Sequence, residues 1–228
     1  MSIMKPLFGT LVLMTLLFVC MSMTNQKRTR IVFFGDSITE AGVKPGGYIT
    51  RMNEALQKRG TAGNYELIGA GISGNKVYDL LVRMEQDVVA RSPDVVVVWI
   101  GVNDVWHKSS SGTGTDADKF EFFYTSIIKK LQAKKIKVLL ATPAAIGERT
   151  DHSNQQDGDL NNYSNIIRRL ATDNKCGLID LRSAFLSYNL KHNTSNRESG
   201  ILTTDRVHLN EAGNSLVAEK MMDALTQK

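Results

Sequence analysis

The sequence predicts an α/β fold: a five-stranded parallel sheet between two layers of helices, forming a three-layer α/β/α sandwich. Short apolar runs alternate along the chain with longer segments whose apolar residues recur at helical spacing. One run, Val95-Val96-Val97-Val98-Trp99-Ile100, is apolar on both faces, as only a central strand covered on both sides needs to be. Strands that alternate with helices in this way form parallel sheets.

Five short runs are predicted to be the strands. The first is Ile31-Val32-Phe33-Phe34, which is rich in β-branched and aromatic residues and is stopped by a glycine. The others are residues 65–68, 95–100, 137–142 and 178–180. We expect the strand order 2-1-3-4-5 of flavodoxin-like folds.

The helices are predicted between these strands. Val77, Leu80, Leu81, Met84 and Val88 follow one another at the spacing of an amphipathic helix. Helical patterns also cover residues 47–58, 120–131, 160–171 and 184–190, and a last helix begins near residue 210. The glycine-rich stretch 69–75 and the residues 101–104 are interpreted as turns. The polar stretch 109–115 is interpreted as a surface loop, with a mobile rim of the site as the alternative.

The composition is that of a globular protein, with 228 residues of which 42% are hydrophobic and 22% charged. This length allows one substantial core, so we expect one α/β domain. The net charge of +5 comes from short basic clusters such as Lys129-Lys130 and Lys134-Lys135, which no aromatic residues interleave. Such clusters are typical of solvated faces, and we expect no nucleic-acid partner.

The first 23 residues differ from the rest. Lys5 precedes a nearly uncharged stretch from Leu7 to Met23, and a polar segment follows, which is the pattern of a secretory signal peptide. An uncleaved membrane anchor and a lipid attached at Cys20 are the alternatives. We therefore predict a signal peptide or a membrane or lipid anchor at 1–23 and one folded domain at 28–228. The protein is then exported, whether periplasmic, secreted or held at the envelope, and the mature domain is not stably inserted in a membrane.

Three strand ends bring chemically useful groups to one edge of the predicted sheet. Ser37 follows the first strand, Gly74 the second and Asn103 the third. In open α/β sheets ligands bind at this carboxyl edge. Ser37 or Thr39 can also be no more than a cap of the next helix, so the interpretation depends on what else reaches the edge.

The stretch Asp205-Arg206-Val207-His208 lies just before the last helix, in a connection that can return to the same edge. A serine hydroxyl is a weak nucleophile until a base takes its proton, and histidine titrates near neutrality. His208 is the candidate base. Asp205 is the candidate acceptor that holds the other nitrogen of the imidazole in place.

Attack on an ester carbonyl produces an oxyanion, which needs fixed hydrogen-bond donors. The candidates are the backbone N–H groups of Ser37 and Gly74 and the side-chain amide of Asn103. Trp106 and His107 follow closely, and they are expected either to line the substrate pocket or to be a core tryptophan and an exposed histidine.

Two acidic residues adjoin these positions. Asp36 precedes Ser37, and Asp104 follows Asn103. We interpret both as organisers of their turns through hydrogen bonds from side chain to backbone. Asp36 is also a candidate for the substrate pocket because it stands next to the proposed nucleophile.

Four blocks in this order resemble the SGNH hydrolases, also called GDSL-type esterases and lipases. They are Gly35-Asp36-Ser37, Ile72-Ser73-Gly74-Asn75, Gly101-Val102-Asn103-Asp104 and Asp205-Arg206-Val207-His208, and they span nearly all of the chain after its first segment. Ile38 and Val102 depart from the usual leucine and glycine of the family, and neither change removes a catalytic group.

The resemblance implies a hydrolase domain of the SGNH fold over residues 28–228. It implies that Ser37 is the nucleophile and an oxyanion donor, that Gly74 and Asn103 are the other donors, and that His208 and Asp205 are the base and its partner. It also implies that no metal or organic cofactor takes part.

A nucleotide site and a zinc site are the first two rivals. Residues 69–74 match G-x-G-x-x-G, but Asp94, the acidic residue at the expected spacing, stands before the third strand and so at the opposite edge of the sheet. The histidines at 107, 152, 192 and 208 are far apart and lack the spacing of a zinc motif. Both readings are disfavoured.

The sequence thus predicts a serine esterase that hydrolyses a carboxylic ester through an acyl-enzyme. A short acyl group such as acetate, on a carbohydrate, is expected because an exported single-domain chain without an apolar lid suits short acyl chains. A lipase, lysophospholipase or thioesterase is the alternative within the family. A glycan-binding module without catalysis is the alternative from another class, and intact Ser37, Asp205 and His208 disfavour it. The expected partner is a small-molecule or glycan ester, and the oligomeric state is not predicted.

Overall fold

A five-stranded parallel sheet forms the centre of the computed structural model, which describes residues 27–226. The strand order is β2-β1-β3-β4-β5, as predicted, and every neighbouring pair is parallel. The three-layer α/β/α fold is therefore confirmed. The strands are β1 (Thr29–Gly35), β2 (Tyr65–Gly71), β3 (Val95–Trp99), β4 (Lys137–Ala141) and β5 (Gly177–Ile179).

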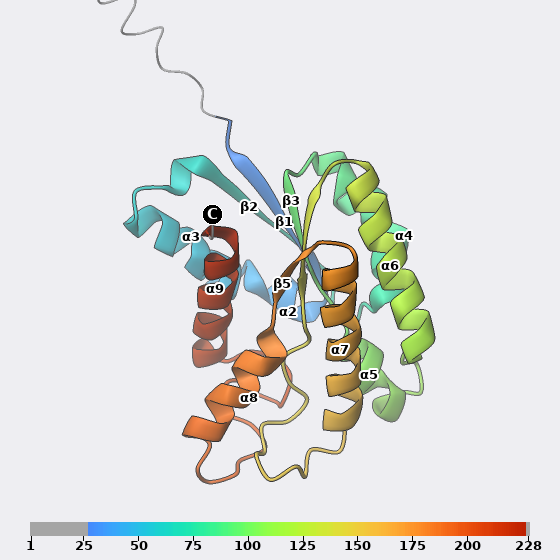
Figure 1. The fold of residues 1–228 in the computed structure, drawn as a ribbon. Coiled ribbons are helices and arrows are strands. Elements are labelled where there is room, and N and C mark those ends of the chain that lie inside the picture. The colour runs from blue at the N-terminus through green and yellow to red at the C-terminus, as the bar shows by residue number, and fades with distance from the viewer. Residues whose placement is uncertain (1–26, 227–228) are drawn as a thin grey trace, which may run out of the picture.

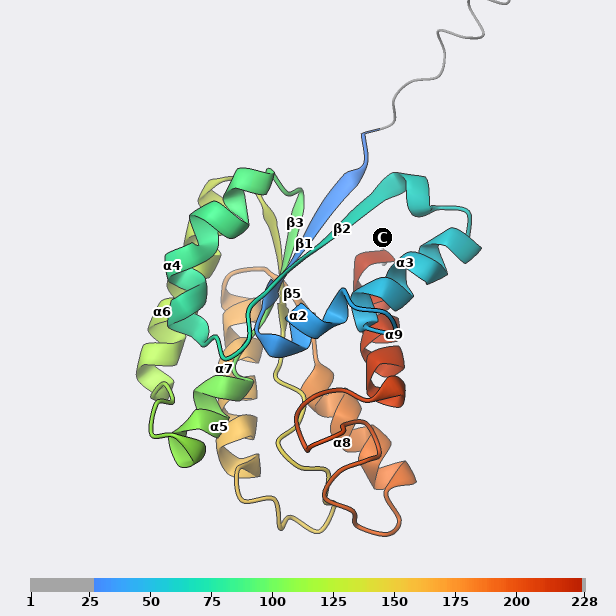
Figure 2. The ribbon, with the colours of Figure 1, turned by 180° about the vertical axis from the view of Figure 1, so that it is seen from behind.

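Helices cover both faces of the sheet (Figure 1). Helices α3 and α9 pack together on one face and α4, α6 and α7 on the other, as the view from behind also shows (Figure 2). Helices α2, α5 and α8 begin directly after β1, β3 and β5. The helices are α2 (Ser37–Gly42), α3 (Tyr48–Lys58), α4 (Val77–Asp87), α5 (Val102–Ser110), α6 (Ala117–Ala133), α7 (Asp157–Asp173), α8 (Leu181–His192) and α9 (Glu211–Thr226), with short 3-10 turns η1 (Ala62–Asn64) and η2 (Val89–Arg91).

The inner strands β1 and β3 are buried on both faces. Side chains 31–34 of β1 and 96–98 of β3 are at most 1% exposed. Burial of one such side chain contributes about 1.5–3 kcal/mol to folding, and a strand between two helical layers buries all of them. This is why these two runs carry no polar residue.

The pairing register aligns three strand ends. Gly35, the last residue of β1, lies opposite Gly71 of β2 and Trp99 of β3. Because the strands are parallel, the chain leaves all three at the same edge. The segments that carry Ser37, Gly74 and Asn103 therefore start side by side.

Strand β2 is longer than the sequence predicted. It continues through Gly69, Ala70 and Gly71, which the sequence analysis assigned to a glycine-rich turn. A Cβ atom on Gly71 would lie 2.1 Å from the backbone nitrogen of Glu40, in helix α2. The glycine thus lets α2 pack directly on the strand, and the turn begins only at Ile72.

Helix α5 was not predicted. From the sequence, residues 101–104 are expected to form a turn and residues 109–115 a surface loop or a rim of the site. Gly101 caps this helix with φ of +126°, a backbone conformation open to glycine, and its carbonyl accepts the N–H of Val105 at 3.2 Å. Val102 to Val105 are buried, so tertiary packing and not the local pattern stabilises the helix.

The predicted strand at 178–180 begins one residue earlier, and its last residue, Asp180, is instead the N-cap of α8. The Asp180 side chain accepts the N–H of Ser183 at 3.2 Å. Helix α8 therefore extends beyond the predicted 184–190 at both ends.

The predicted signal peptide or anchor at 1–23 lies outside the described residues. Within residues 27–226, no helix has both the length and the apolar character that crossing a membrane requires.

The close packing of α2 on Gly71 predicts that a larger residue at this position destabilises the protein. We expect Gly71→Ala to lower the free energy of unfolding by about 3 kcal/mol or more, because its Cβ meets rigid backbone. Gly158→Ala is the control, since no atom lies within 4 Å of its Cβ position. Urea unfolding should show the control within about 0.5 kcal/mol of the wild type or slightly above it. Equal stability of the two variants would contradict the close packing.

Candidate active site

A hydroxyl from the end of β1 and an imidazole from the loop before α9 meet at the carboxyl edge of the sheet. Ser37 Oγ lies 3.0 Å from His208 Nε2, although the residues are 171 positions apart in sequence. His208 Nδ1 lies 2.7 Å from Asp205 Oδ2. If Nδ1 carries the proton, Nε2 is free to accept the Ser37 hydroxyl hydrogen. The arrangement can therefore activate the hydroxyl for attack.

The Asp205 carboxylate is also fixed by the backbone. Its Oδ1 accepts the N–H groups of His208 at 2.8 Å and of Val207 at 3.1 Å. Partial burial opposes ionisation of this carboxyl, but the hydrogen bonds from the His208 ring and from the two backbone N–H groups outweigh it, so the pKa of Asp205 is lowered. The residue is consequently a fixed anion at neutral pH, and it holds the imidazole by both its ring and its backbone.

Ser37 is the first residue of α2, and Asp36 is its N-cap. The Asp36 side chain accepts the N–H of Ile38 at 3.0 Å, and its carbonyl accepts that of Glu40 at 2.9 Å. The N–H of Ser37 stands in the first helical turn, where backbone donors have no acceptor within the helix. Asp36 is only 2% exposed, so it lies beneath the site and does not line a substrate pocket as the sequence analysis allowed.

Gly74 lies in an exposed turn that the N–H of Asn75 closes on the carbonyl of Ile72 at 3.3 Å. Its φ is +78°, and no atom lies within 4 Å of the position of a Cβ. Backbone conformation, and not crowding, thus calls for glycine here. Asn103, in the first turn of α5, donates from Nδ2 to the Asn75 carbonyl at 3.0 Å. This bond ties the two turns together, and the amide has a second N–H for another acceptor.

Arg83 of α4 holds the same turn, and the sequence analysis did not identify it. Its Nε donates to Asn75 Oδ1 at 2.6 Å, and its Nη2 donates to the carbonyls of Gly35 at 2.7 Å and Ala70 at 3.0 Å. The guanidinium lies over the Phe34 ring, 4.5 Å from its centroid. One side chain therefore connects the ends of β1 and β2 with the turn of Gly74. A single arginine on an amphipathic helix carries no sequence signal of this role.

Glu148, in the loop after β4, performs a similar task for the other half of the site. The residue is 1% exposed. Its carboxyl oxygens accept three successive backbone N–H groups, those of Ile201 at 2.8 Å, Leu202 at 2.6 Å and Thr203 at 2.8 Å. Nothing in the local sequence distinguishes this glutamate from a surface residue, so sequence analysis missed it.

The segment that Glu148 holds leads directly to His208. The hydroxyl of Thr203 accepts the N–H of Arg206 at 3.2 Å, and the N–H of Thr204 bonds to the carbonyl of His208 at 2.8 Å. Thr203 also forms an isolated antiparallel bridge with Leu209. The loop from 203 to 209 is thus held together by its own hydrogen bonds, and Glu148 attaches it to the loop that follows β4.

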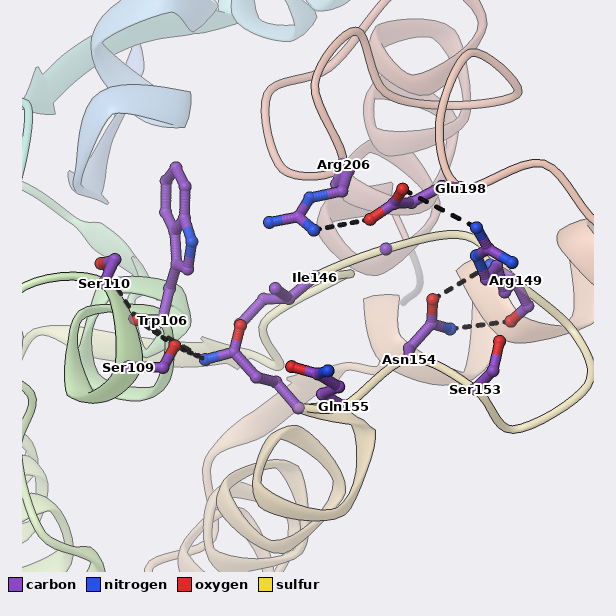
Figure 3. Close-up of a pocket in the computed structure, with 12 residues that line it drawn as sticks. Trp106, Ser109, Ser110, Ile146, Arg149, Ser153, Asn154, Gln155, Glu198 and Arg206 are labelled. Carbon is purple, nitrogen blue, oxygen red and sulfur yellow. Dashed lines mark hydrogen bonds and ion pairs between the residues drawn. The ribbon is translucent and has the colours of Figure 1, made fainter.

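Trp106 joins the site to a neighbouring cavity. Its ring centroid is 6.4 Å from that of His208, with the planes at 71°. It also lines a cavity of about 560 Å³ that lies between α5, the loop after β4 and the segment 198–206 (Figure 3). Ser109 and Ser110 belong to α5 and line the same cavity, so they are not part of a separate surface loop. The His107 ring is tilted by 43° against that of Trp106, with the ring centroids 5.8 Å apart, and His107 is not among the lining residues.

Two buried carboxyl groups lie behind the site. Burial raises the pKa of Asp36 to about 7, and the nearby Asp104 adds to the shift. Burial also raises the pKa of Asp104 to about 6. The Asp104 oxygens accept the N–H of Val77 at 3.2 and 3.3 Å, so this side chain fixes the start of α4, whereas the sequence predicts that it organises its own turn.

This fold and these contacts define a carboxylic ester hydrolase that has a serine hydroxyl next to an imidazole and a carboxylate. The chain belongs to the GDSL-like lipase/acylhydrolase family, whose family model matches residues 33–216. The resemblance seen in the four sequence blocks is therefore confirmed.

Several known proteins are similar over nearly the whole chain. An acetylxylan esterase of Geobacillus stearothermophilus is 27% identical over 211 residues, which cover 85% of this chain and 92% of that protein. The crystal structure of an acetyl xylan esterase, AlAXEase, is 66% identical, covers 86% of this chain and 99% of that one, and has a TM-score of 0.85. The structure of Axe2, an acetylxylan esterase from Geobacillus stearothermophilus, is 25% identical, covers 90% and 98% of the two chains, and has a TM-score of 0.77.

The raised pKa of Asp36 makes a prediction about stability and pH. A carboxyl whose pKa rises from 3.8 to about 7 on folding stabilises the protein below pH 4, and this contribution is lost as the pH rises toward 7. Asp36→Asn keeps an acceptor for the N–H of Ile38 and removes the titration. Between pH 5 and pH 8 we expect the wild type to lose on the order of 1–4 kcal/mol more than this variant in urea unfolding.

Asp118→Asn, at an exposed position of α6, is the control and should retain the pH dependence of the wild type. The same pH slope in Asp36→Asn and the wild type would show that Asp36 does not titrate in this range.

The three hydrogen bonds that Glu148 accepts lead to a prediction about stability and activity. Glu148→Gln places a donor where a backbone N–H points, and we expect it to lower the free energy of unfolding by about 2–4 kcal/mol and to lower kcat. Glu54→Gln, on an exposed face of α3, should change the stability by less than about 0.5 kcal/mol. Urea unfolding and ester hydrolysis measure both effects. A fully stable Glu148→Gln protein would contradict the proposed attachment of the loop.

Proposed function

We propose that this protein removes acetyl groups from acetylated xylan or its oligosaccharides, with Ser37, His208 and Asp205 as its catalytic residues. The observation that carries the reaction is the continuous chain of hydrogen bonds from Ser37 Oγ through the His208 ring to Asp205. The acetyl xylan esterase that is 66% identical supports the choice of substrate.

In the first step, Ser37 Oγ attacks the carbonyl carbon of the ester, and its proton passes to His208 Nε2. Asp205 stabilises the imidazolium that forms, because it accepts a hydrogen bond from Nδ1. The carbonyl oxygen becomes an oxyanion. The N–H groups of Ser37 and Gly74 and the amide of Asn103 are its donors, and loss of one such donor costs a factor of about 10² to 10³ in rate.

In the second step, the bond between the carbonyl carbon and the sugar oxygen breaks, and His208 gives its proton to that oxygen. The acetyl group is now bound to Ser37 Oγ. A water molecule then attacks the acetyl carbon while His208 takes a proton from it. His208 returns this proton to Ser37 Oγ as the bond to the acetyl carbon breaks, and acetic acid leaves and ionises to acetate in solvent, so the enzyme is regenerated without a cofactor.

The place of action also belongs to this proposal. The basic and then apolar pattern of residues 1–23 supports export, by cleavage of a signal peptide or by retention at the envelope. An exported esterase would meet a polysaccharide substrate that does not enter the cytoplasm.

The experiment compares p-nitrophenyl acetate with p-nitrophenyl octanoate and labels the protein with a fluorophosphonate. We expect acetate to be the better substrate by more than about tenfold in kcat/KM. Ser37→Ala should lose both labelling and at least about a thousandfold in kcat, since it removes the attacking atom.

Ser126→Ala, at a half-buried position of α6, is the matched control and should retain both. Preference for octanoate would favour a lipase, and labelling that persists in Ser37→Ala would place the nucleophile elsewhere.

A further inference from the structure

The cavity next to Trp106 has the position of a leaving-group site. One of its walls is the Trp106 ring (Figure 3). The centroid of this ring lies 6.4 Å from that of the His208 imidazole, and the two ring planes meet at 71°. Another wall includes Arg206, which is two residues from His208 in the same loop. The ring that would hand a proton to the departing alcohol is therefore adjacent to the cavity, so the alcohol part of the ester is the part that can reach it.

The chemistry of the walls fits a sugar. Apart from Trp106, Ile146 and Gly147, every lining residue carries a hydroxyl, an amide or a charged group. A sugar ring presents hydroxyl groups at its edge and C–H groups on its faces, which suits polar side chains around one aromatic ring. A hydrocarbon chain in the same place would leave these polar groups without partners, at a cost in free energy.

We propose that this cavity binds the sugar chain that carries the acetyl ester and that Arg206 determines the selectivity for it. The inference rests on the proposed function, because it concerns the same reaction, and it adds which side of the site receives the sugar.

Arg206 is held in place by both walls of the cavity. Its backbone has φ of +84°, and its carbonyl accepts the N–H of Gly147 at 2.9 Å, across from its own loop. Its Nη1 donates to Glu198 Oε1 at 2.6 Å, and the side chain is still 43% exposed. A guanidinium has five donors in a fixed plane, of which this bond uses one. The strained backbone and the ion pair thus position a planar donor group on the wall of the cavity.

A second cavity offers a competing place for the sugar. It has a volume of about 430 Å³, and its lining includes Arg51 and the two residues that follow His208 in the chain, Leu209 and Asn210. Arg51 pairs with Glu211 at 3.3 Å, as Arg206 pairs with Glu198. Among the described residues that line this second cavity, none is aromatic. It lacks the ring that a sugar face would stack on, and for that reason we assign the sugar to the first cavity.

The test compares two substrates in two matched variants. The substrates are acetylated xylotetraose and p-nitrophenyl acetate, and the quantity measured is the ratio of their kcat/KM values. Both substrates use Ser37 and His208, so a small shift of the loop changes both values and largely cancels in the ratio. Arg206→Asn removes the guanidinium with a residue that tolerates positive φ. Arg51→Gln removes the corresponding group of the second cavity.

We expect Arg206→Asn to lower the ratio at least about tenfold and Arg51→Gln to leave it within about twofold of the wild type. A ratio that stays constant in Arg206→Asn, or that falls only in Arg51→Gln, would overturn the assignment. Such a result would leave the esterase function intact, because the wild type would still deacetylate the oligosaccharide.

A binding measurement separates the two proposals further. The Ser37→Ala variant cannot hydrolyse an ester, so binding can be measured in it alone. We expect titration calorimetry to show that xylotetraose binds at least about tenfold more weakly when Arg206→Asn is added to this variant. Equal binding with and without Arg206 would overturn the inference. A wild type that hydrolyses p-nitrophenyl acetate but not acetylated xylotetraose would instead refute the proposed substrate.

Discussion

The aligned register of the neighbouring strands β2, β1 and β3 is the constraint on which the rest of the molecule depends. Gly35 lies opposite both Gly71 and Trp99, so β1, β2 and β3 end at one height and release their turns toward the same space. This requires glycine at Gly71, where α2 packs against the strand backbone. A shift of one residue in a parallel pair would turn the buried side chains to the other face, and the doubly covered core prevents it. The apolar runs of β1 and β3 therefore also determine where the polar groups meet.

Two side chains convert this common edge into a defined geometry. Arg83 binds the ends of β1 and β2 and the turn of Gly74, whereas Glu148 binds the segment that precedes Asp205 and His208. Each uses several hydrogen bonds to backbone groups or to side chains of the turns. A site assembled from distant loops would otherwise be loose, and a displacement of about 1 Å can cost a factor of 10² in rate. The support of the site is thus polar, while the support of the sheet is apolar.

The proposed reaction places the two parts of the ester in chemically different surroundings of Ser37. The donors proposed for the oxyanion are on the side of Gly74 and Asn103, and the polar cavity with Trp106 and Arg206 is on the side of His208. The strained backbone of Arg206 is compatible with a functional position, since strain persists where the surrounding contacts over-determine it. The Asp36 carboxyl is buried beneath Ser37. It caps α2 by accepting the N–H of Ile38, and its burial raises its pKa.

The sequence by itself determined the fold class, the strand order and the four blocks that carry Ser37, Gly74, Asn103 and His208, because local apolar patterns and turn residues encode strands and their ends. The tertiary structure alone decided the rest. Helix α5 forms because its first turn is buried, and β2 extends through Gly71 because α2 packs on it. The roles of Arg83 and Glu148 and the cavity beside Trp106 arise from segments far apart in the chain. No local sequence pattern indicates such contacts. An arginine on a helix or a glutamate in a loop gives the same pattern whether its side chain faces water or bonds to the segments of the site.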